Sequence, residues 1–173
     1  MSVTVVDGFV ASGLCCGIKP SGAPDLALVA TADHRPVTAA GVFTSNRMTA
    51  APVLVCRDHL SRTGGRAAAV VLNSGNANAA TGTTGLADAE KMCELTAETL
   101  GCSTDEVLVC STGWIGYPLP MDAITAGIGQ VADSLDPTGG LAAAEAIMTT
   151  DTVTKSTTVS GDGFVVGGIA KGA

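Results

Sequence analysis

Residues 106–116 read Glu-Val-Leu-Val-Cys-Ser-Thr-Gly-Trp-Ile-Gly, an apolar run that breaks abruptly into a turn rich in hydroxyl groups and glycine. A short apolar run bounded by turn residues is typical of a buried strand. Where such a strand ends in Ser111-Thr112-Gly113, one backbone N–H and one hydroxyl can point at a ligand, as an oxyanion site requires. An ordinary turn whose hydroxyl caps the next helix would explain the same residues.

The rest of the chain offers no nucleophile and base to accompany this turn. The two histidines, His34 and His59, have charged neighbours and lack the spacing of a catalytic triad or a zinc site. We expect both to be exposed loop residues, and we predict no metal site and no cofactor site. The turn therefore indicates one half of an active site.

Composition excludes several classes of function. The net charge is −7 and only nine Lys and Arg residues are scattered along the chain, which argues against binding to nucleic acid. The longest apolar run, Ala67 to Leu72, is far shorter than the ~20 residues of a membrane span. With no visible targeting segment, the expected location is the cytoplasm. The six cysteines show no C-x-x-C spacing and mostly lie in apolar segments, which predicts reduced, buried thiols.

Alternating strand and helix patterns predict a single mixed α/β domain over residues 1–173. The expected strands are 25–31, 37–44, 53–56, 67–72, 107–110, 154–159 and 164–169. The expected helices are 83–101, 120–132 and 141–148. The polar turn at 32–36 predicts a hairpin between the first two strands, and Ser160-Gly161-Asp162-Gly163 predicts one between the last two.

Three segments taken together resemble the α chain of the ornithine acetyltransferases, also called bifunctional glutamate N-acetyltransferases, of arginine biosynthesis. Each segment alone is common, but their shared order and spacing are hard to obtain by accident, and the match covers nearly the whole chain. The segments are 71–82 (Val-Leu-Asn-Ser-Gly-Asn-Ala-Asn-Ala-Ala-Thr-Gly), 110–116 with 119–122 (Leu-Pro-Met-Asp), and 146–152 with 167–172 (Gly-Gly-Ile-Ala-Lys-Gly).

The resemblance implies a layered α/β sandwich completed by a β chain that is not in this sequence, the two chains pairing again into an α2β2 heterotetramer. It also implies a precursor that cleaves itself before a threonine, which becomes the nucleophile at the N-terminus of the β chain. In the family this cut lies a short distance beyond the Lys-Gly segment. We therefore expect the true C-terminus of the α chain to lie beyond Ala173.

The resemblance assigns roles to four residues of this chain. The Thr112 hydroxyl and the Gly113 backbone N–H would form the oxyanion hole, while Thr149 and Lys171 would contact the amino-acid substrate. The Lys171 ammonium suits the α-carboxylate of an acetylated amino acid. By position alone, Thr149 would be a local cap at a helix end and Lys171 a solvated lysine.

The reaction implied is a two-step transfer of acetyl from N-acetylornithine to glutamate through an ester on the β-chain threonine, with acetyl-CoA as a further potential acetyl donor. Two other readings stay open. The same architecture would serve a self-cleaved amidase or aminopeptidase that passes the acyl group to water. A chain acting alone would be a non-enzymatic metabolite-binding module.

Overall fold

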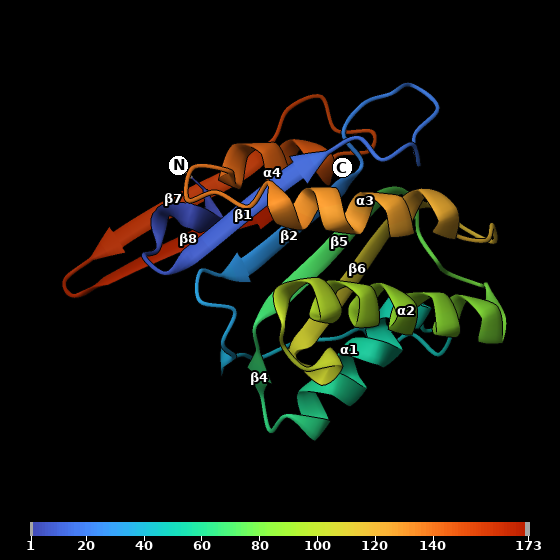
Figure 1. The fold of residues 1–173 in the computed structure, drawn as a ribbon, viewed down its shortest axis with the longest axis horizontal. Helices are drawn as coiled ribbons and strands as arrows, with labels where there is room; N and C mark the ends of the chain where they lie inside the picture. The colour runs from blue at the N-terminus through green and yellow to red at the C-terminus, as the bar shows by residue number, and fades with distance from the viewer. Residues whose placement is uncertain (1, 172–173) are drawn as a thin grey trace.

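A four-stranded sheet forms the centre of the computed structural model, which describes residues 2–171 (Figure 1). The strands follow the order β1-β2-β5-β6, with β1 spanning Phe9–Leu14, β2 Leu26–Thr31, β5 Ala69–Asn76 and β6 Val107–Trp114. β2 runs antiparallel to both β1 and β5, whereas β6 is parallel to β5. The β5–β6 connection therefore carries a helix, as parallel neighbours require.

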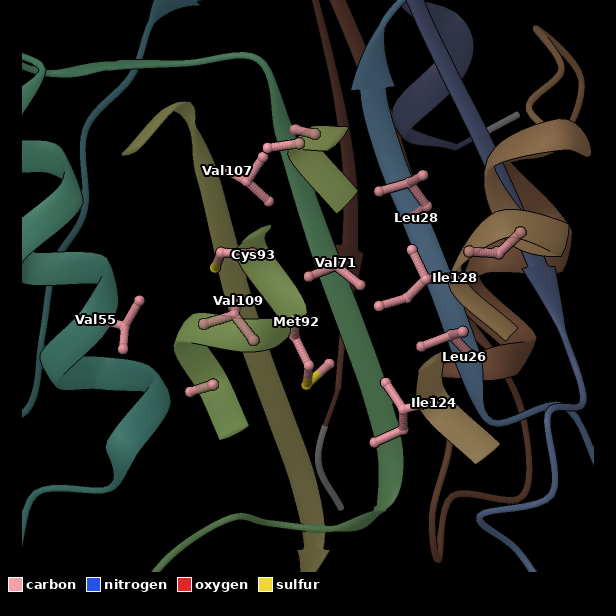
Figure 2. Packing of buried hydrophobic residues seen from close by; sticks show 14 of the residues in the cluster. Leu26, Leu28, Val55, Val71, Met92, Cys93, Val107, Val109, Ile124 and Ile128 are labelled. Carbon is pink, nitrogen blue, oxygen red and sulfur yellow. The ribbon is translucent and has the colours of Figure 1, made fainter. Parts of the chain in front are cut away.

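Three helices pack on one face of this sheet: α1 (Ala51–Arg62), α2 (Gly82–Leu100) and α3 (Met121–Asp133). The main core lies between these helices and the sheet, and Figure 2 shows Val71, Val107 and Val109 pointing toward Met92 and Cys93. On the other face, α4 (Gly140–Ala146) packs through alanines against Ala11 and Ala27. The mixed α/β class predicted from the sequence is confirmed.

Two small sheets complete the fold. β7 (Lys155–Gly161) and β8 (Phe164–Ala170) form an antiparallel hairpin that projects beside α4 (Figure 1). β3 (Val37–Thr38) pairs with β4 (Arg66–Ala67), and short 3₁₀ turns occupy Val3–Val5 and Thr104–Glu106. The hairpin leaves apolar side chains uncovered, namely Val159, Phe164, Val165 and Val166.

Most of the strongly patterned elements form as predicted. α2 ends at Gly101, which takes the left-handed conformation with φ 73° and donates its N–H to the Ala97 carbonyl. The final hairpin is confirmed, with Gly161 paired to Phe164. Within residues 2–171, no helix combines the length and the apolarity that a membrane span needs.

Two predictions in the first half of the chain are wrong. Residues 53–56 belong to helix α1 and not to a strand, because Pro52 fits the first helical turn and Val55, Cys56 and His59 all face the core. The hairpin between 25–31 and 37–44 does not form, because β2 pairs with β1 and β5, and β3 is only two residues long. Strand β1 was not predicted at all.

Candidate active site

Ser111, Thr112 and Gly113, which the sequence predicted to form a turn, are instead the last part of strand β6, which continues to Trp114. They lie near the point where the parallel strands β5 and β6 end. Their register places Ser74 beside Thr112 and Gly75 beside Gly113, and the ladder becomes irregular between Gly75 and Asn76. The carboxyl ends of parallel strands are a common place for ligand sites in α/β sheets. The core strand therefore delivers the hydroxyl of Thr112 to such an edge.

Gly113 takes a backbone conformation and a close contact that exclude a side chain. Its φ is 138°, and a Cβ there would lie 2.2 Å from the carbonyl carbon of Gly75 and 2.5 Å from the Asn76 nitrogen. Both neighbours are backbone atoms and cannot swing aside. The close packing of β6 on β5 at this point thus depends on glycine.

A cavity of about 270 Å³ opens beside this turn. It brings together Thr112 and Lys171, two of the predicted site residues, although one ends a central strand and the other directly follows β8. The remaining lining residues are Leu72, Asn73, Cys110, Ser111 and Ile147. Its size suits a small metabolite or part of one.

The charges around the cavity favour an anion. Among the described residues that line it, Lys171 is the one that carries a charge, and its side chain is exposed. Within residues 2–171, the Thr112 hydroxyl has no hydrogen-bond partner and is free to donate to a ligand oxygen. A ligand that carries both a carbonyl and a carboxylate matches these two groups.

Thr149 is not among the residues that line this cavity, and Gly113 is not either. Thr149 follows the lining residue Ile147 by two positions and is half-buried, and its N–H lies 3.4 Å from the Asp151 Oδ2. A hydrogen bond from the Lys155 ammonium, 2.6 Å from Oδ1, holds the pKa of Asp151 below its usual range. Of the four predicted site residues, the structure thus brings Thr112 and Lys171 together at the cavity, and it does not place Gly113 or Thr149 among the lining residues.

Two buried polar atoms near the cavity lack partners among the described residues. They are the Asn73 Oδ1 and the Ser111 Oγ, which belong to neighbouring positions of the β5–β6 ladder. The other end of the Asn73 amide is satisfied, since its Nδ2 donates to the Asn76 carbonyl at 2.9 Å. Buried polar atoms are rarely left unpaired, so this pair marks an unusual point in the fold.

Two asparagines at the end of β5 and just after it hold the surrounding loops. Asn76 donates through Nδ2 to the Pro118 carbonyl at 2.9 Å, and Asn78 donates to the Gly85 carbonyl at 2.7 Å. These bonds tie the turn after β6 and the start of α2 to the end of β5. Periodicity alone carries no signal for such contacts, because the partners are backbone carbonyls of distant loops.

The histidines take no part in the cavity, but the expectation that both are exposed is wrong. His59 is fully buried, with Nδ1 2.8 Å from the Val107 carbonyl and Nε2 3.1 Å from the Glu90 Oε2. His34 is half-buried, and its Nδ1 lies 2.9 Å from the Leu100 carbonyl. His59 thus links α1 to β6 and α2, and His34 links the loop after β2 to the end of α2. Both histidines are structural.

All six cysteines are free thiols, as expected, but only Cys56 and Cys93 are buried. Cys15 and Cys110 are exposed, which corrects the expectation of buried thiols throughout. Across residues 2–171, no group of three or more His, Cys, Asp or Glu side chains is arranged to hold a metal ion.

Comparison with known proteins gives one consistent result. Residues 10–173 match the ArgJ family. The chain is 53% identical over 173 residues to the arginine biosynthesis bifunctional protein ArgJ of Streptomyces coelicolor, and 49% identical over 175 residues to that of Gloeobacter violaceus. These alignments cover 100% and 99% of this chain but only 44% and 42% of the relatives, so the chain spans less than half of their length.

Two solved structures share the fold closely. The ornithine acetyltransferase of Mycobacterium tuberculosis, solved in complex with ornithine, has a TM-score of 0.94 at 48% identity, covering 99% of this chain and 92% of that one. The arginine biosynthesis bifunctional protein of Bacillus halodurans has a TM-score of 0.89 at 41% identity, covering 100% of this chain and 91% of that one.

Proposed function

Because this chain belongs to the ArgJ family, we propose that it is the α part of an acetyltransferase that moves acetyl from N-acetylornithine to glutamate. The relatives are named as bifunctional proteins of arginine biosynthesis, and one similar structure is an ornithine acetyltransferase with ornithine bound. The observation that carries the proposal is the cavity in which Thr112 and Lys171 meet. It offers a hydroxyl donor for a carbonyl and a cation for a carboxylate.

In the first step, the hydroxyl of a threonine at the N-terminus of a partner chain attacks the acetyl carbonyl of N-acetylornithine. The Thr112 hydroxyl and the Gly113 N–H donate to the oxygen that becomes negative. The C–N bond then breaks, and the proton lost by the hydroxyl passes through the threonine's own α-amino group to the departing ornithine amine. The result is an acetyl ester and free ornithine.

In the second step, the amine of glutamate attacks the ester carbonyl. The same two donors stabilise the second oxyanion, the C–O bond breaks, and the proton returns to the threonine oxygen. N-acetylglutamate leaves and the enzyme is restored. This order predicts ping-pong kinetics.

Lys171 accounts for how one pocket can serve two substrates. Ornithine and glutamate differ in their side chains but share the α-carboxylate, which the Lys171 ammonium is suited to bind. We assign Thr149 to the same amino-acid substrate, as a neighbour of the lining residue Ile147. No cofactor enters this scheme, and acetyl-CoA would be an alternative acetyl donor.

The partner is a β chain from the same precursor, and the assembly is an α2β2 heterotetramer located in the cytoplasm. Exposed apolar side chains support the need for a partner. Trp114 and Tyr117, which follow the oxyanion turn, are 68% and 60% exposed, and their ring centroids lie 5.8 Å apart. Contiguous exposed apolar surface marks sites of interaction, and this aromatic pair would form part of such a surface.

Intact mass spectrometry after incubation with N-acetylornithine tests the proposal. We expect a companion chain that begins with threonine and gains one acetyl group. Thr112→Ala should slow acetylation by about 10²–10³-fold, the usual effect of losing one oxyanion donor. Thr99→Ala is the matched control, because its hydroxyl donates to the Leu95 carbonyl on the exposed side of α2, away from the cavity. An unmodified companion chain, or equal rates in the two variants, would reject the proposal.

A further inference from the structure

A loop between β1 and β2 is organised by a single buried carboxylate. Asp25 is fully buried, and its two carboxylate oxygens accept the backbone N–H groups of Cys16 at 2.7 Å and of Lys19 at 2.8 Å. The Asp25 carbonyl in turn accepts the N–H of Ser74 on β5 at 2.9 Å. These bonds fix the position of Lys19 relative to the strand end that carries the candidate site.

The ammonium of Lys19 bridges this loop to the segment that follows α4. Its Nζ donates to the carbonyls of Pro24 and Met148, both at 2.6 Å. Two positions earlier, the Ala146 carbonyl accepts the hydroxyl of Ser74 at 2.5 Å. Ile147, which lines the cavity, therefore stands in the chain between two anchored carbonyls, those of Ala146 and Met148. Thr149 comes directly after Met148.

The stem of Lys19 lies close to the other side of the candidate site. A Cβ added to Gly75 would stand 3.2 Å from the Lys19 Cγ, so the stem lies over this glycine. Gly75 is the register partner of Gly113 and makes the close backbone approach described above. One side chain thus contacts both the oxyanion strand pair and the segment before Thr149.

We propose that Lys19 is a positioning residue for the substrate pocket: its ammonium fixes Ile147 and Thr149, and its stem supports the Gly75–Gly113 strand pair. This inference rests on the proposed function, since it takes that cavity as the place where the acetylated amino acid binds. Lys19 itself is not among the residues that line the cavity, so it acts through its neighbours.

The energetics favour a specific role over an incidental contact. Burial lowers the pKa of Lys19, and the Asp25 carboxylate opposes that shift. Hydrogen bonds from a charged donor are stronger than neutral ones, and two carbonyls use two of the three ammonium protons. A surface lysine placed only for solubility would not give up its hydration in this way.

Amide hydrogen exchange of residues 147–150 in the two-chain protein tests the positioning directly. Lys19→Met keeps most of the stem and removes the ammonium, so exchange there should become about 10–100-fold faster, as for a lost hydrogen bond to a charged group. Lys19→Arg should keep wild-type exchange, because a guanidinium can donate to both carbonyls. Lys91→Met is the matched control, since Lys91 pairs with Glu94 on the exposed side of α2.

Steady-state kinetics separate positioning from plain stability. Lys19→Met should raise KM for N-acetylornithine about tenfold and leave kcat within about threefold, because contacts that bind ground and transition states alike are lost. Lys19→Ala also removes the stem over Gly75, so kcat should fall as well. Unchanged exchange in Lys19→Met, or an unchanged KM despite faster exchange, would overturn the proposal.

The failure of the proposed function would look different. A wild-type protein that binds N-acetylornithine without transferring acetyl would reject the transfer reaction alone. The positioning role of Lys19 would then be tested by comparing the Kd for N-acetylornithine of Lys19→Met with that of the wild type. A wild-type protein that does not bind N-acetylornithine would reject both proposals.

Discussion

Replacing Gly113 with alanine should destabilise the fold much more than the same change at Gly116, three positions along. Both glycines have positive φ, 138° at Gly113 and 83° at Gly116, so alanine strains the backbone at either site. That strain costs about 1–3 kcal/mol in each case. The two sites differ in what surrounds the new methyl group.

At Gly116 nothing lies within 4 Å of the added Cβ, whereas at Gly113 the Cβ would approach three backbone atoms of Gly75 and Asn76 within 2.5 Å. Relieving this overlap requires β5 and β6 to separate locally, and overpacking of this kind costs typically about 1–3 kcal/mol. Taking about 2 kcal/mol as the extra cost, the melting temperature of Gly113→Ala should lie about 4–8 °C below that of Gly116→Ala.

Thermal unfolding of the two variants, each measured as the two-chain protein, gives the comparison without reference to activity. Urea titration should agree, with a lower midpoint for Gly113→Ala and a similar slope. Equal melting temperatures would refute the reasoning, because they would mean that the strand pair can open at Gly113 without cost. Acetyl transfer by Gly113→Ala should also fall, since the displaced backbone carries the N–H of the proposed oxyanion hole.

Iodoacetamide at pH 8 should label Cys15 well before Cys16. Cys15 is exposed, whereas burial and the nearby Asp25 carboxylate raise the pKa of the Cys16 thiol to about 12. Mass mapping of the labelled peptides measures the two rates, and equal rates would contradict the prediction. The hydrogen bond from Lys155 lowers the pKa of Asp151, so the pair stabilises the fold at pH values above the unfolded pKa of about 3.9. This contribution should be lost as the pH falls through the lowered pKa of Asp151 in the folded protein. Melting temperatures measured against pH should show that loss in the wild type and not in Asp151→Asn. His59→Ala should lower the free energy of unfolding measured in urea by about 1–3 kcal/mol, because it leaves the buried Val107 carbonyl without its partner. A smaller loss would contradict this and would mean that water takes the place of the imidazole ring.

Long periodic segments were the most predictable part of this fold. α2 has apolar residues every three or four positions and a glycine at its end, so local physics alone determines its type and its limits. α1 was missed because the run from Val53 to Cys56 is too short for its period to distinguish strand from helix. β1 was missed because Ser12 and Gly13 interrupt its apolar pattern, although Ser12 is buried and bonds to the Val131 carbonyl of α3.

The candidate site was less accessible to such reasoning. The strand that ends at Thr112 could be predicted from its own residues, but its proximity to Lys171 depends on how the β7–β8 hairpin docks. Resemblance to a family suggested that pairing, and no local pattern did. The bond from Lys19 to the Met148 carbonyl had no signal at all, because a carbonyl is present at every residue and its partner is chosen by the tertiary fold.

The cavity joins Leu72, on the third strand of the central sheet, to Lys171, beyond the final hairpin. During synthesis, the central sheet and its helices can assemble long before Lys171 leaves the ribosome, since domains fold as their residues emerge. Closing so long a loop is also slow compared with forming the local helices. The anion-binding end of the pocket therefore matures after the strand end that carries Thr112, and a nascent chain with Thr112 already in place would not yet hold a substrate carboxylate at Lys171.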